Sequence, residues 1–442
     1  MQEPKVLTII VTYDKKEYVS NLLKSLQELN FKNYDVIVVD NASTDGTADY
    51  IEEHFPDVSV IRNSVNSGGS GGFNTGLNYA FKKYGYEYYW LLDNDVVVSK
   101  DTLEKLIEVL DKDNEIAIAG SQMCQLDNPR VTNEIGAFVD LHMGCLVLNR
   151  HLTRRKNNTT GIFDVDYVAG ASMLVRANVA KRAGCWEDFF IHFDDVDWCL
   201  RIKKMGHRVV GVADSVIWHL SAMEKPITWA LYYDVRNMLF LLEKHATKKD
   251  VKRFLRRQCL HALKLELKGL TPLAELVLDA IRDFLTGKKG KKAFSSLSGI
   301  SEDEIKNTHP DRDVLVYQNE WFNIKEFPFE DRYKDSIKEI MLPGYLIDAR
   351  FYWRDNNRIP IKDYGKFSKL LAVIIGMLGY RKYTRSYIDF RNASCVPAFL
   401  SEELVVKINE INWLIKRDAS NVRRSFSKIC KKAVKYLLLH GI

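Results

Sequence analysis

The first 250 residues alternate between short apolar runs and segments whose apolar positions follow a helical spacing. Apolar, often β-branched runs over residues 6–12, 34–39 and 58–61 predict buried strands. Between the first two, residues 15–29 place apolar side chains at the period of a helix. Strands that alternate with helices predict an α/β fold with a parallel sheet and right-handed crossovers.

The pattern is sharpest over residues 89–95, Tyr-Trp-Leu-Leu-Asp-Asn-Asp, where an apolar run leads directly into two acids. In a strand, the i, i+2 spacing of Asp93 and Asp95 puts both carboxylates on one face. The end of a buried central strand is where an α/β sheet presents ligand groups. The two acids therefore fit a Mg²⁺ or Mn²⁺ site that would bridge to phosphate oxygens. A plain Asp-Asn-Asp turn is the alternative.

A glycine-rich stretch precedes that strand. Residues 66–76 begin Asn-Ser-Gly-Gly-Ser-Gly-Gly, with four glycines in five positions. Glycines let backbone come close to a ligand, and a helix beginning near Ser70 would aim its N–H groups at an anion. A flexible loop is the alternative.

A second acidic group follows an aromatic run. Residues 189–193 lead into Asp194, Asp195 and Asp197, which fall in the first turn of a helix predicted to run to about Met205. Helix capping explains one or two acids, but not three delivered together by aromatic residues. Carboxylates held against aromatic rings can have raised pKa values, which is how a general base is tuned.

Two later residues are weaker candidates. His219 could complete a metal site with the acids near residue 94, although a lone histidine is more often structural or on the surface. Arg236 interrupts an otherwise apolar helix predicted over residues 229–245. We expect Arg236 to face a polar site; the alternative is an arginine that snorkels at a domain boundary.

Charge divides unevenly along the 442 residues, a length that predicts two or three domains. Residues 1–250 carry 28 Lys and Arg against 35 Asp and Glu, a net charge of −7, and residues 251–442 carry 36 against 23, a net charge of +13. This asymmetry favours chemistry in the first half and attachment to an anionic partner in the second. Zinc-finger spacings and RNA-binding aromatic motifs are missing, so we expect no nucleic-acid partner.

The second half carries basic segments with apolar residues among them. Residues 251–286 are helical in pattern with a break near Pro272, residues 288–292 are a basic run, and residues 366–385 and 425–440 place apolar residues among basic ones. Basic amphipathic helices of this kind fit an anionic membrane surface. An ordinary helical domain or an oligomer interface is the alternative.

Localisation follows from what the sequence lacks. The seven cysteines are scattered without a CxxC pair, which favours reduced thiols in a cytosolic setting. The N-terminus leads straight into a strand and does not resemble a signal peptide. No stretch reaches the roughly 18 apolar residues of a membrane span. Together with the basic segments, these features predict a cytoplasmic protein that is peripheral on a membrane.

The order of these features resembles the GT-A fold of family 2 glycosyltransferases, inverting enzymes that use nucleotide sugars and a divalent cation. The matching segments, within residues 6–240, are Thr12-Tyr13, Val39–Thr47, the glycine-rich stretch from Asn66, Asp93-Asn94-Asp95 and the helix of Asp194, Asp195 and Arg201. Within this family the chain is most similar to bacterial galactofuranosyltransferases. The details that carry this similarity are Asn66–Phe73, Phe190–Arg201, Trp218-His219 and Tyr232–Asn237. Rhamnosyltransferases share much of the pattern. The Gln-x-x-Arg-Trp signature of processive, membrane-embedded synthases is missing.

The resemblance implies a Rossmann-like GT-A domain over residues 1–248 and a mainly helical domain over residues 249–442, for membrane association or oligomerisation. It also implies roles for single residues. Contacts to the nucleotide sugar would come from Thr12, Asp40, Asn66, Gly68, Gly69, Asp93 and Asn94. Ligands of Mn²⁺ or Mg²⁺ would be Asp93, Asp95 and His219. Asp195 would be the general base and Asp194 the fallback, and the acceptor would be bound by Asp194, Trp186 and Arg236.

The activity implied is transfer of galactofuranose from UDP-galactofuranose to a glycan, expected to be lipid-linked, in bacterial cell-surface polysaccharide synthesis such as that of O antigen. A rhamnosyltransferase that uses dTDP-rhamnose is the first alternative. A non-catalytic module that binds nucleotide sugars is the second.

Overall fold

The computed structural model describes residues 3–126, 128–150, 160–219, 230–267 and 271–292. It also describes short segments at residues 153–154, 313–319, 322–329, 340–342, 350–353, 361–363, 429, 431–433 and 435–436. The chain divides into two compact units. Unit 1 consists of Met1–Lys225, Arg236–Val251 and Asp283–Lys292, and unit 2 of Pro226–Val235, Lys252–Arg282 and Ala293–Ile442. The single boundary at residue 248 stays a prediction.

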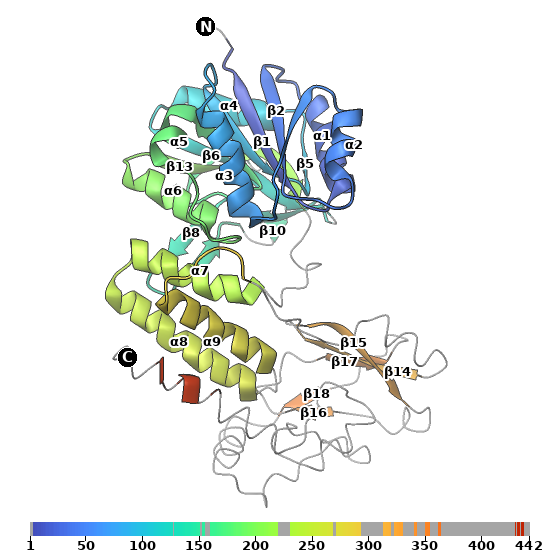
Figure 1. Ribbon diagram of the computed structural model, residues 1–442, viewed down its shortest axis with the longest axis vertical. Helices are drawn as coiled ribbons and strands as arrows, with labels where there is room; N and C mark the ends of the chain where they lie inside the picture. Colours follow the sequence, from blue (N-terminus) through green and yellow to red (C-terminus); the bar gives the residue numbers. More distant parts are fainter. Residues whose placement is uncertain are drawn as a thin grey trace, which may run out of the picture. The chain divides into compact units, whose positions relative to one another are not determined.

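Unit 1 is built on a mixed sheet with the strand order β10-β7-β6-β12-β4-β1-β2-β3 (Figure 1). These strands are β1 (Val6–Thr12), β2 (Tyr34–Asp40), β3 (Val58–Arg62), β4 (Tyr88–Asp93), β6 (Ile116–Gln125), β7 (Val131–Glu134), β10 (Thr153–Arg154) and β12 (Ser172–Arg176). Strand β13 (Arg208–His219) pairs with β6 and also with β5 (Val96–Val98) and β11 (Ile162–Asp164). A separate hairpin joins β8 (Ala137–Asp140) to β9 (Cys145–Leu148).

The predicted parallel arrangement is confirmed for β1, β2, β3 and β4 but not for the whole sheet. Strand β12 lies between β4 and β6 and is antiparallel to both. An apolar run predicts a strand but not its direction in the sheet. Strand β13 is continuous, with a register shift between Val212 and Val216.

Helices cover both faces of this sheet. They are α1 (Lys16–Gln27), α2 (Thr47–His54), α3 (Gly68–Phe81), α4 (Thr102–Lys112), α5 (Ala177–Ala183) and α6 (Asp194–Lys204). Residues Val6 and Ile10 of β1 share a buried core with α1 and α4. Ile9 points the opposite way, because side chains alternate along a strand, and contacts α3.

Two glycines of α3 explain how closely this helix lies on the sheet. A Cβ at Gly72 would be 2.3 Å from Val11 Cγ1, and one at Gly76 would be 2.3 Å from Ile9 Cγ2. Larger residues there would push the helix off β1. Part of the glycine-rich stretch therefore serves helix packing.

Three longer helices follow: α7 (Ala230–His245), α8 (Lys248–Leu267) and α9 (Thr271–Leu285). Pro272 is the second residue of α9, which agrees with the predicted break and with the preference of proline for a first helical turn. In unit 2, β14 (Asp313–Asn319) pairs with β15 (Phe322–Phe329) and β17 (Arg350–Trp353), and β16 (Ile340–Leu342) pairs with β18 (Ile361–Asp363).

No helix in the described part of the chain is long and apolar enough to cross a membrane. The predicted amphipathic segment at residues 366–385 and most of the one at 425–440 lie outside the described residues.

Candidate active site

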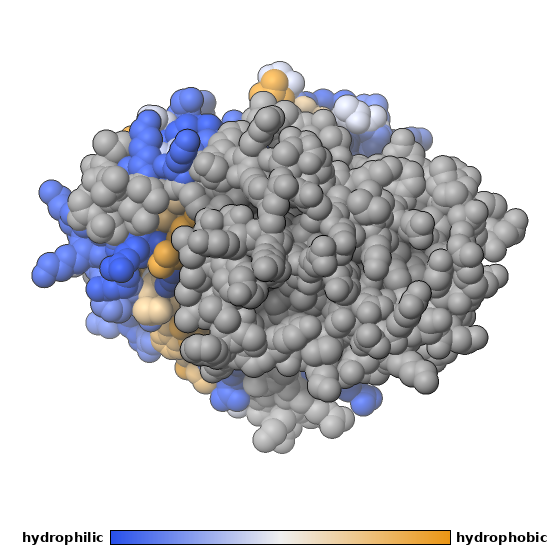
Figure 2. All heavy atoms as spheres, turned by 90° about the horizontal axis from the view of Figure 1, so that it is seen from below, coloured by the Kyte–Doolittle hydropathy of each residue, from blue (hydrophilic) through white to orange (hydrophobic). Residues whose placement is uncertain are grey.

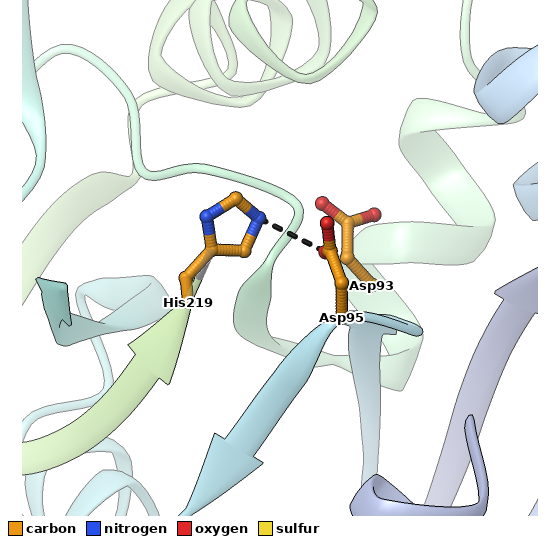
Figure 3. Close-up of side chains that lie close together, drawn as sticks. All are labelled: Asp93, Asp95 and His219. Atoms are coloured by element: carbon orange, nitrogen blue, oxygen red, sulfur yellow. Dashed lines mark ion pairs between the residues drawn. The ribbon is translucent and has the colours of Figure 1, made fainter. Parts of the chain in front are cut away.

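Sheet register brings His219 to the two acids that follow β4. Asp93 is the last residue of β4, and β5 begins at Val96, after two intervening residues. Because β13 is antiparallel to β5 with His219 opposite Val96, the imidazole lies next to Asp95. His219 Nε2 is 3.0 Å from Asp95 Oδ1, and Asp93 points toward the same place (Figure 3). One ligand atom from each of the three residues lies within 4.8 Å of the others.

The three side chains, called here the Asp-Asp-His cluster, fit a divalent cation. Two carboxylates at this separation repel each other unless a positive charge lies between them. Carboxylate oxygens suit Mg²⁺ and Mn²⁺, and an imidazole is acceptable to Mn²⁺. The side chains of Asp95 and His219 are 14% and 17% exposed, which leaves room for ligands from a substrate. The Asp-Asn-Asp turn, which was the alternative interpretation of the sequence, is also present, and it carries the two acids of the cluster.

A network of hydrogen bonds joins the glycine-rich segment to the end of β1. Asn94 Nδ2 donates to Thr12 Oγ1 over 3.0 Å, and the backbone N–H of Asn41 donates to the Thr12 carbonyl over 2.8 Å. Asn41 Nδ2 donates to Asn66 Oδ1 over 3.2 Å and to the Gly68 carbonyl over 2.8 Å. The predicted nucleotide contacts Thr12, Asn66, Gly68 and Asn94 thus lie along one edge. Asn41, which connects them, was missed, although it follows Asp40 in a segment that the resemblance includes.

Asp40 lies at the same edge, because it is the last residue of β2 and pairs with Thr12 in the parallel register. It is 4% exposed, and its Oδ1 accepts a 2.8 Å hydrogen bond from the backbone N–H of Ser43. This bond fixes the carboxylate at the start of the loop that precedes α2.

Asp194 is held by the first turn of α3. Ser70 Oγ donates to Asp194 Oδ2 over 2.6 Å, and the backbone N–H of Ser70 donates to the Phe190 carbonyl over 3.2 Å. A Cβ at Gly69 would lie 4.0 Å from the same Asp194 oxygen. Burial raises the pKa of Asp194, and the Ser70 hydrogen bond works against this shift.

Asp195 has the properties of a general base. Its Oδ2 accepts a 3.1 Å hydrogen bond from the backbone N–H of Gly170, and its Oδ1 accepts one of 2.7 Å from that of Val196. Burial, then the charge of Asp194 and, more weakly, that of Asp93, raise the pKa of Asp195 to about 7. The effect of Asp93 indicates that the acid pair lies near the Asp-Asp-His cluster. A carboxylate with a pKa near neutral pH suits proton abstraction.

The turn that presents the acid pair is strained. Phe190, His192 and Phe193 have φ values of 71°, 63° and 67°, in the left-handed region that non-glycine residues rarely adopt. Asn237 Nδ2 donates to the carbonyls of Phe189, Ile191 and His192 over 3.1, 2.6 and 3.1 Å. These bonds hold the turn in place, as strained functional segments require.

Comparison with known proteins agrees with this geometry. Residues 8–182 match the family model described as Glycosyl transferase family 2. The chain carries a family 2 glycosyltransferase domain. The match ends before the acid pair and before His219, so those residues rest on the structure alone.

Two of the curated relatives that the chain matches are named for the sugars that they transfer. Galactofuranosyltransferase GlfT2 of Mycobacterium tuberculosis (strain ATCC 25618 / H37Rv) is 27% identical over 285 residues, 59% of this chain and 44% of the relative. Poly-beta-1,6-N-acetyl-D-glucosamine synthase of Staphylococcus epidermidis is 26% identical over 210 residues, 44% of this chain and 45% of the relative. The chain thus spans less than half the length of these curated relatives.

Among solved structures, the mannosyltransferase PcManGT from Pyrobaculum calidifontis, in complex with GDP-Man and Mn²⁺, aligns with a TM-score of 0.41 and 19% identity. The alignment covers 65% of this chain and 80% of PcManGT.

Arg236 donates hydrogen bonds to backbone carbonyls within unit 1. The residue is 1% exposed, and its Nη2 donates to the Phe189 carbonyl over 2.9 Å and its Nη1 to the Gly290 carbonyl over 2.8 Å. The expectation that Arg236 contacts the acceptor stays a prediction. The sequence correctly indicated that this arginine, in an apolar helix, has polar partners. One of them is the Phe189 carbonyl, next to the strained turn.

Trp186 keeps a polar atom available. Its ring is 5% exposed and lies 4.6 Å from the Phe73 ring, and a Cβ at Gly170 would be 2.8 Å from Trp186 Cη2. Trp186 Nε1 is buried without a hydrogen-bond partner among the described residues. Because Gly170 also donates to Asp195, Trp186 lies near the base, and its predicted contact with the acceptor remains open.

The third acid of α6 has a different function from the other two. Asp197 is fully buried and contacts Arg201 over 2.8 Å, Lys244 over 3.0 Å and His245 over 2.8 Å. Burial would raise the pKa of Asp197, but the His245 hydrogen bond and the charges of Arg201 and Lys244 outweigh it and lower the pKa to about 2. Asp197 therefore joins α6 to α7 as a structural ion.

Glu134 is a buried acid near His219 that sequence reasoning did not single out. It ends β7, is 5% exposed, and burial raises its pKa to about 7, with a weaker opposing effect from His219. Its position near His219 follows from the β7-β6-β13 order of the sheet, in which Glu134, Met123 and Ile217 are in register. A lone glutamate in a variable segment gives no such signal in the sequence.

Proposed function

We propose that this glycosyltransferase moves galactofuranose from UDP-galactofuranose to a lipid-linked glycan in bacterial cell-surface polysaccharide synthesis. The observation that carries the proposal is the presence of Asp195, with a pKa near 7, in the electrostatic reach of Asp93 of the Asp-Asp-His cluster. The choice of sugar is supported by the motifs around Asn66 and His219 and by two mycobacterial galactofuranosyltransferase relatives.

The proposed reaction is a single displacement with inversion. Asp195 takes a proton from an acceptor hydroxyl while the oxygen attacks the anomeric carbon from the face opposite the nucleotide. The new bond joins that oxygen to the anomeric carbon, the bond from carbon to phosphate oxygen breaks, and UDP leaves with the electron pair. The proton ends on Asp195.

The other residues bind and orient. Thr12, Asp40, Asn66, Gly68, Gly69 and Asn94 hold the nucleotide, and N–H groups at the start of α3 face its charge. Asp93, Asp95 and His219 would hold Mn²⁺ or Mg²⁺, which supplies positive charge that neutralises the diphosphate leaving group. Asp194 and Trp186 bind the acceptor.

Two measurements on the full chain test the donor. Thermal-shift assays with UDP and with dTDP, each with and without Mn²⁺, should show the larger stabilisation with UDP plus Mn²⁺. Incubation of donor sugars with a lipid-linked acceptor should then yield, by mass spectrometry, the mass increase of one or more hexoses. Preference for dTDP and transfer of a deoxyhexose would favour a rhamnosyltransferase. Nucleotide binding without any transfer would favour a binding module.

We also propose that the protein is peripheral on the cytoplasmic face of the inner membrane, where a lipid-linked acceptor is reached. Helix α8 supports this, since Lys252, Arg253 and Arg256 are exposed and Leu260 is 52% exposed on it. Figure 2 gives one face of the molecule, where the described side chains are mainly hydrophilic with a narrow strip of hydrophobic ones. Sedimentation with phosphatidylglycerol vesicles, but not with phosphatidylcholine vesicles, is the expected result.

A further inference from the structure

The basic run at residues 288–292, predicted as part of a membrane-binding half, belongs to unit 1 with the glycosyltransferase domain. Its middle is fixed at Gly290, whose N–H donates to the Asp188 carbonyl over 3.0 Å and whose carbonyl accepts from Arg236 over 2.8 Å. We call residues 287–292 the basic strap. It is tied to the same turn that presents the acid pair.

Two lysines of the strap add ion pairs. Lys289 Nζ is 2.8 Å from Glu187 Oε1 and lies over the Phe240 ring at 5.2 Å. Lys292 Nζ is 3.2 Å from Asp283 Oδ2. The backbone on each side of Lys291 is therefore anchored, and Lys291 starts from a defined position.

Lys291 reaches the nucleotide side of the site. Its Nζ is 3.4 Å from the backbone carbonyl of Asn66 and 5.6 Å from the centre of the Phe190 ring, and the residue is exposed. Asn66 Oδ1 in turn accepts a 2.9 Å hydrogen bond from the N–H of Gly68, at the start of α3. An ammonium group has three donors, and one long bond to a carbonyl leaves it capacity for a further acceptor.

The charges in the site indicate which chemical group accepts a hydrogen bond from Lys291. Asp93, Asp95, Asp194 and Asp195 give the site four carboxylates, and a divalent cation would offset only two of those charges. A diphosphate brings further negative charge to the same edge, so a nearby ammonium group is stabilising.

We propose that Lys291 binds the diphosphate of the nucleotide donor, so that the basic strap completes the donor site. This inference rests on the proposed nucleotide-sugar function. It assigns Lys291 to substrate binding and leaves α8 as the exposed basic surface for lipid. Lys288, in the same run, is exposed and serves as the matched control.

The test is isothermal titration of the full chain with UDP and with uridine, in the presence of Mn²⁺. The variant K291M keeps the aliphatic stem over Phe190 and removes the charge. We expect it to weaken UDP binding about five- to tenfold, as for loss of a charged hydrogen bond, and to leave uridine binding unchanged. K291R and K288M should bind UDP like the wild type, and the defect of K291M should shrink at high salt.

Each result decides one question. If K291M binds UDP as tightly as the wild type does, the role of Lys291 is overturned while the proposed function stands. Equal losses for UDP and uridine overturn the diphosphate contact, because a merely structural strap would affect both. A wild-type chain that binds neither UDP nor dTDP overturns the proposed function itself.

Discussion

Ser70 on α3 donates a 2.6 Å hydrogen bond to Asp194 on α6, across 124 positions of the chain. Both residues are buried, at 0% and 6% exposure. The bond joins the helix that we propose to face the nucleotide to the helix that carries the acid pair. The part of the site proposed for the nucleotide sugar and the part proposed for the glycan are therefore fixed to each other by side chains as well as by the sheet.

Asp195 gives stability a particular dependence on pH. Its pKa rises from the usual 3.8 to about 7, first through burial and then through Asp194. Because the folded state holds this proton more tightly than the unfolded state does, protonated Asp195 contributes to stability. The contribution is fully present below pH 3.8 and is lost as pH rises through about 7. Melting of metal-free protein at pH 5.5 and 8 should show the wild type losing stability relative to D195N. Parallel changes in the two proteins would contradict the assigned pKa.

Replacing His219 tests the Asp-Asp-His cluster. H219A removes one ligand, and we expect the Mn²⁺ dissociation constant, measured from the electron paramagnetic resonance signal of free Mn²⁺, to rise about tenfold or more, by analogy with lost support of metal ligands. H54A, in α2 and outside the cluster, serves as the control and should bind Mn²⁺ like the wild type. An unchanged Mn²⁺ affinity in H219A would exclude the ligand role.

Asp197 should matter for folding more than for chemistry. D197N leaves Arg201 and Lys244 without their buried partner, and breaking a buried pair costs about 3–5 kcal/mol. Because the pKa of Asp197 is lowered to about 2, its contribution is present above pH 3.8 and lost as pH falls toward 2. Urea unfolding measures the loss. D49N removes an exposed partner of Arg62 and should cost little; similar losses in D49N and D197N would contradict this account.

Gly68 should be intolerant of any side chain. It has φ +73°, and a Cβ there would be 2.1 Å from the Phe190 carbonyl oxygen, so G68A must shift either α3 or the strained turn. Gly85 has φ +86° with nothing within 4 Å, which makes G85A a control for backbone strain alone. We expect G85A to cost about 1–2 kcal/mol, and G68A to cost clearly more and to weaken UDP binding. Equal effects in urea unfolding would mean that the contact with Phe190 is unimportant.

The sequence predicted the parts of this site that depend on local pattern. Asp93 and Asp95 follow from an apolar strand that ends in two alternating acids, and the helix from Asp194 follows from its acidic first turn. The sequence did not predict that Asp197 has a different role from Asp195, because that role depends on Lys244 and His245 of another helix. The contacts of Arg236 with the carbonyls of Phe189 and Gly290 did not follow either, since these carbonyls are distant in the chain.

Non-local register and strand direction were beyond the sequence pattern. The place of His219 beside Asp95 requires β13 to pair with β5, and the resemblance supplied that residue where spacing could not. Strand β12 turned out antiparallel, and the glycines at 72 and 76 serve close packing on β1. The basic run that contains Lys291 was assigned to a membrane-binding surface, because a count of charges does not predict which lysine lies near the site.

The most direct test compares galactofuranose transfer by the wild type and by D195N, with UDP-galactofuranose, Mn²⁺ and a lipid-linked acceptor, followed by mass spectrometry. The account predicts Mn²⁺-dependent transfer by the wild type and a rate about 10²- to 10⁴-fold lower in D195N, the usual contribution of a general base, with UDP affinity nearly unchanged. Transfer by D195N at close to the wild-type rate would contradict it.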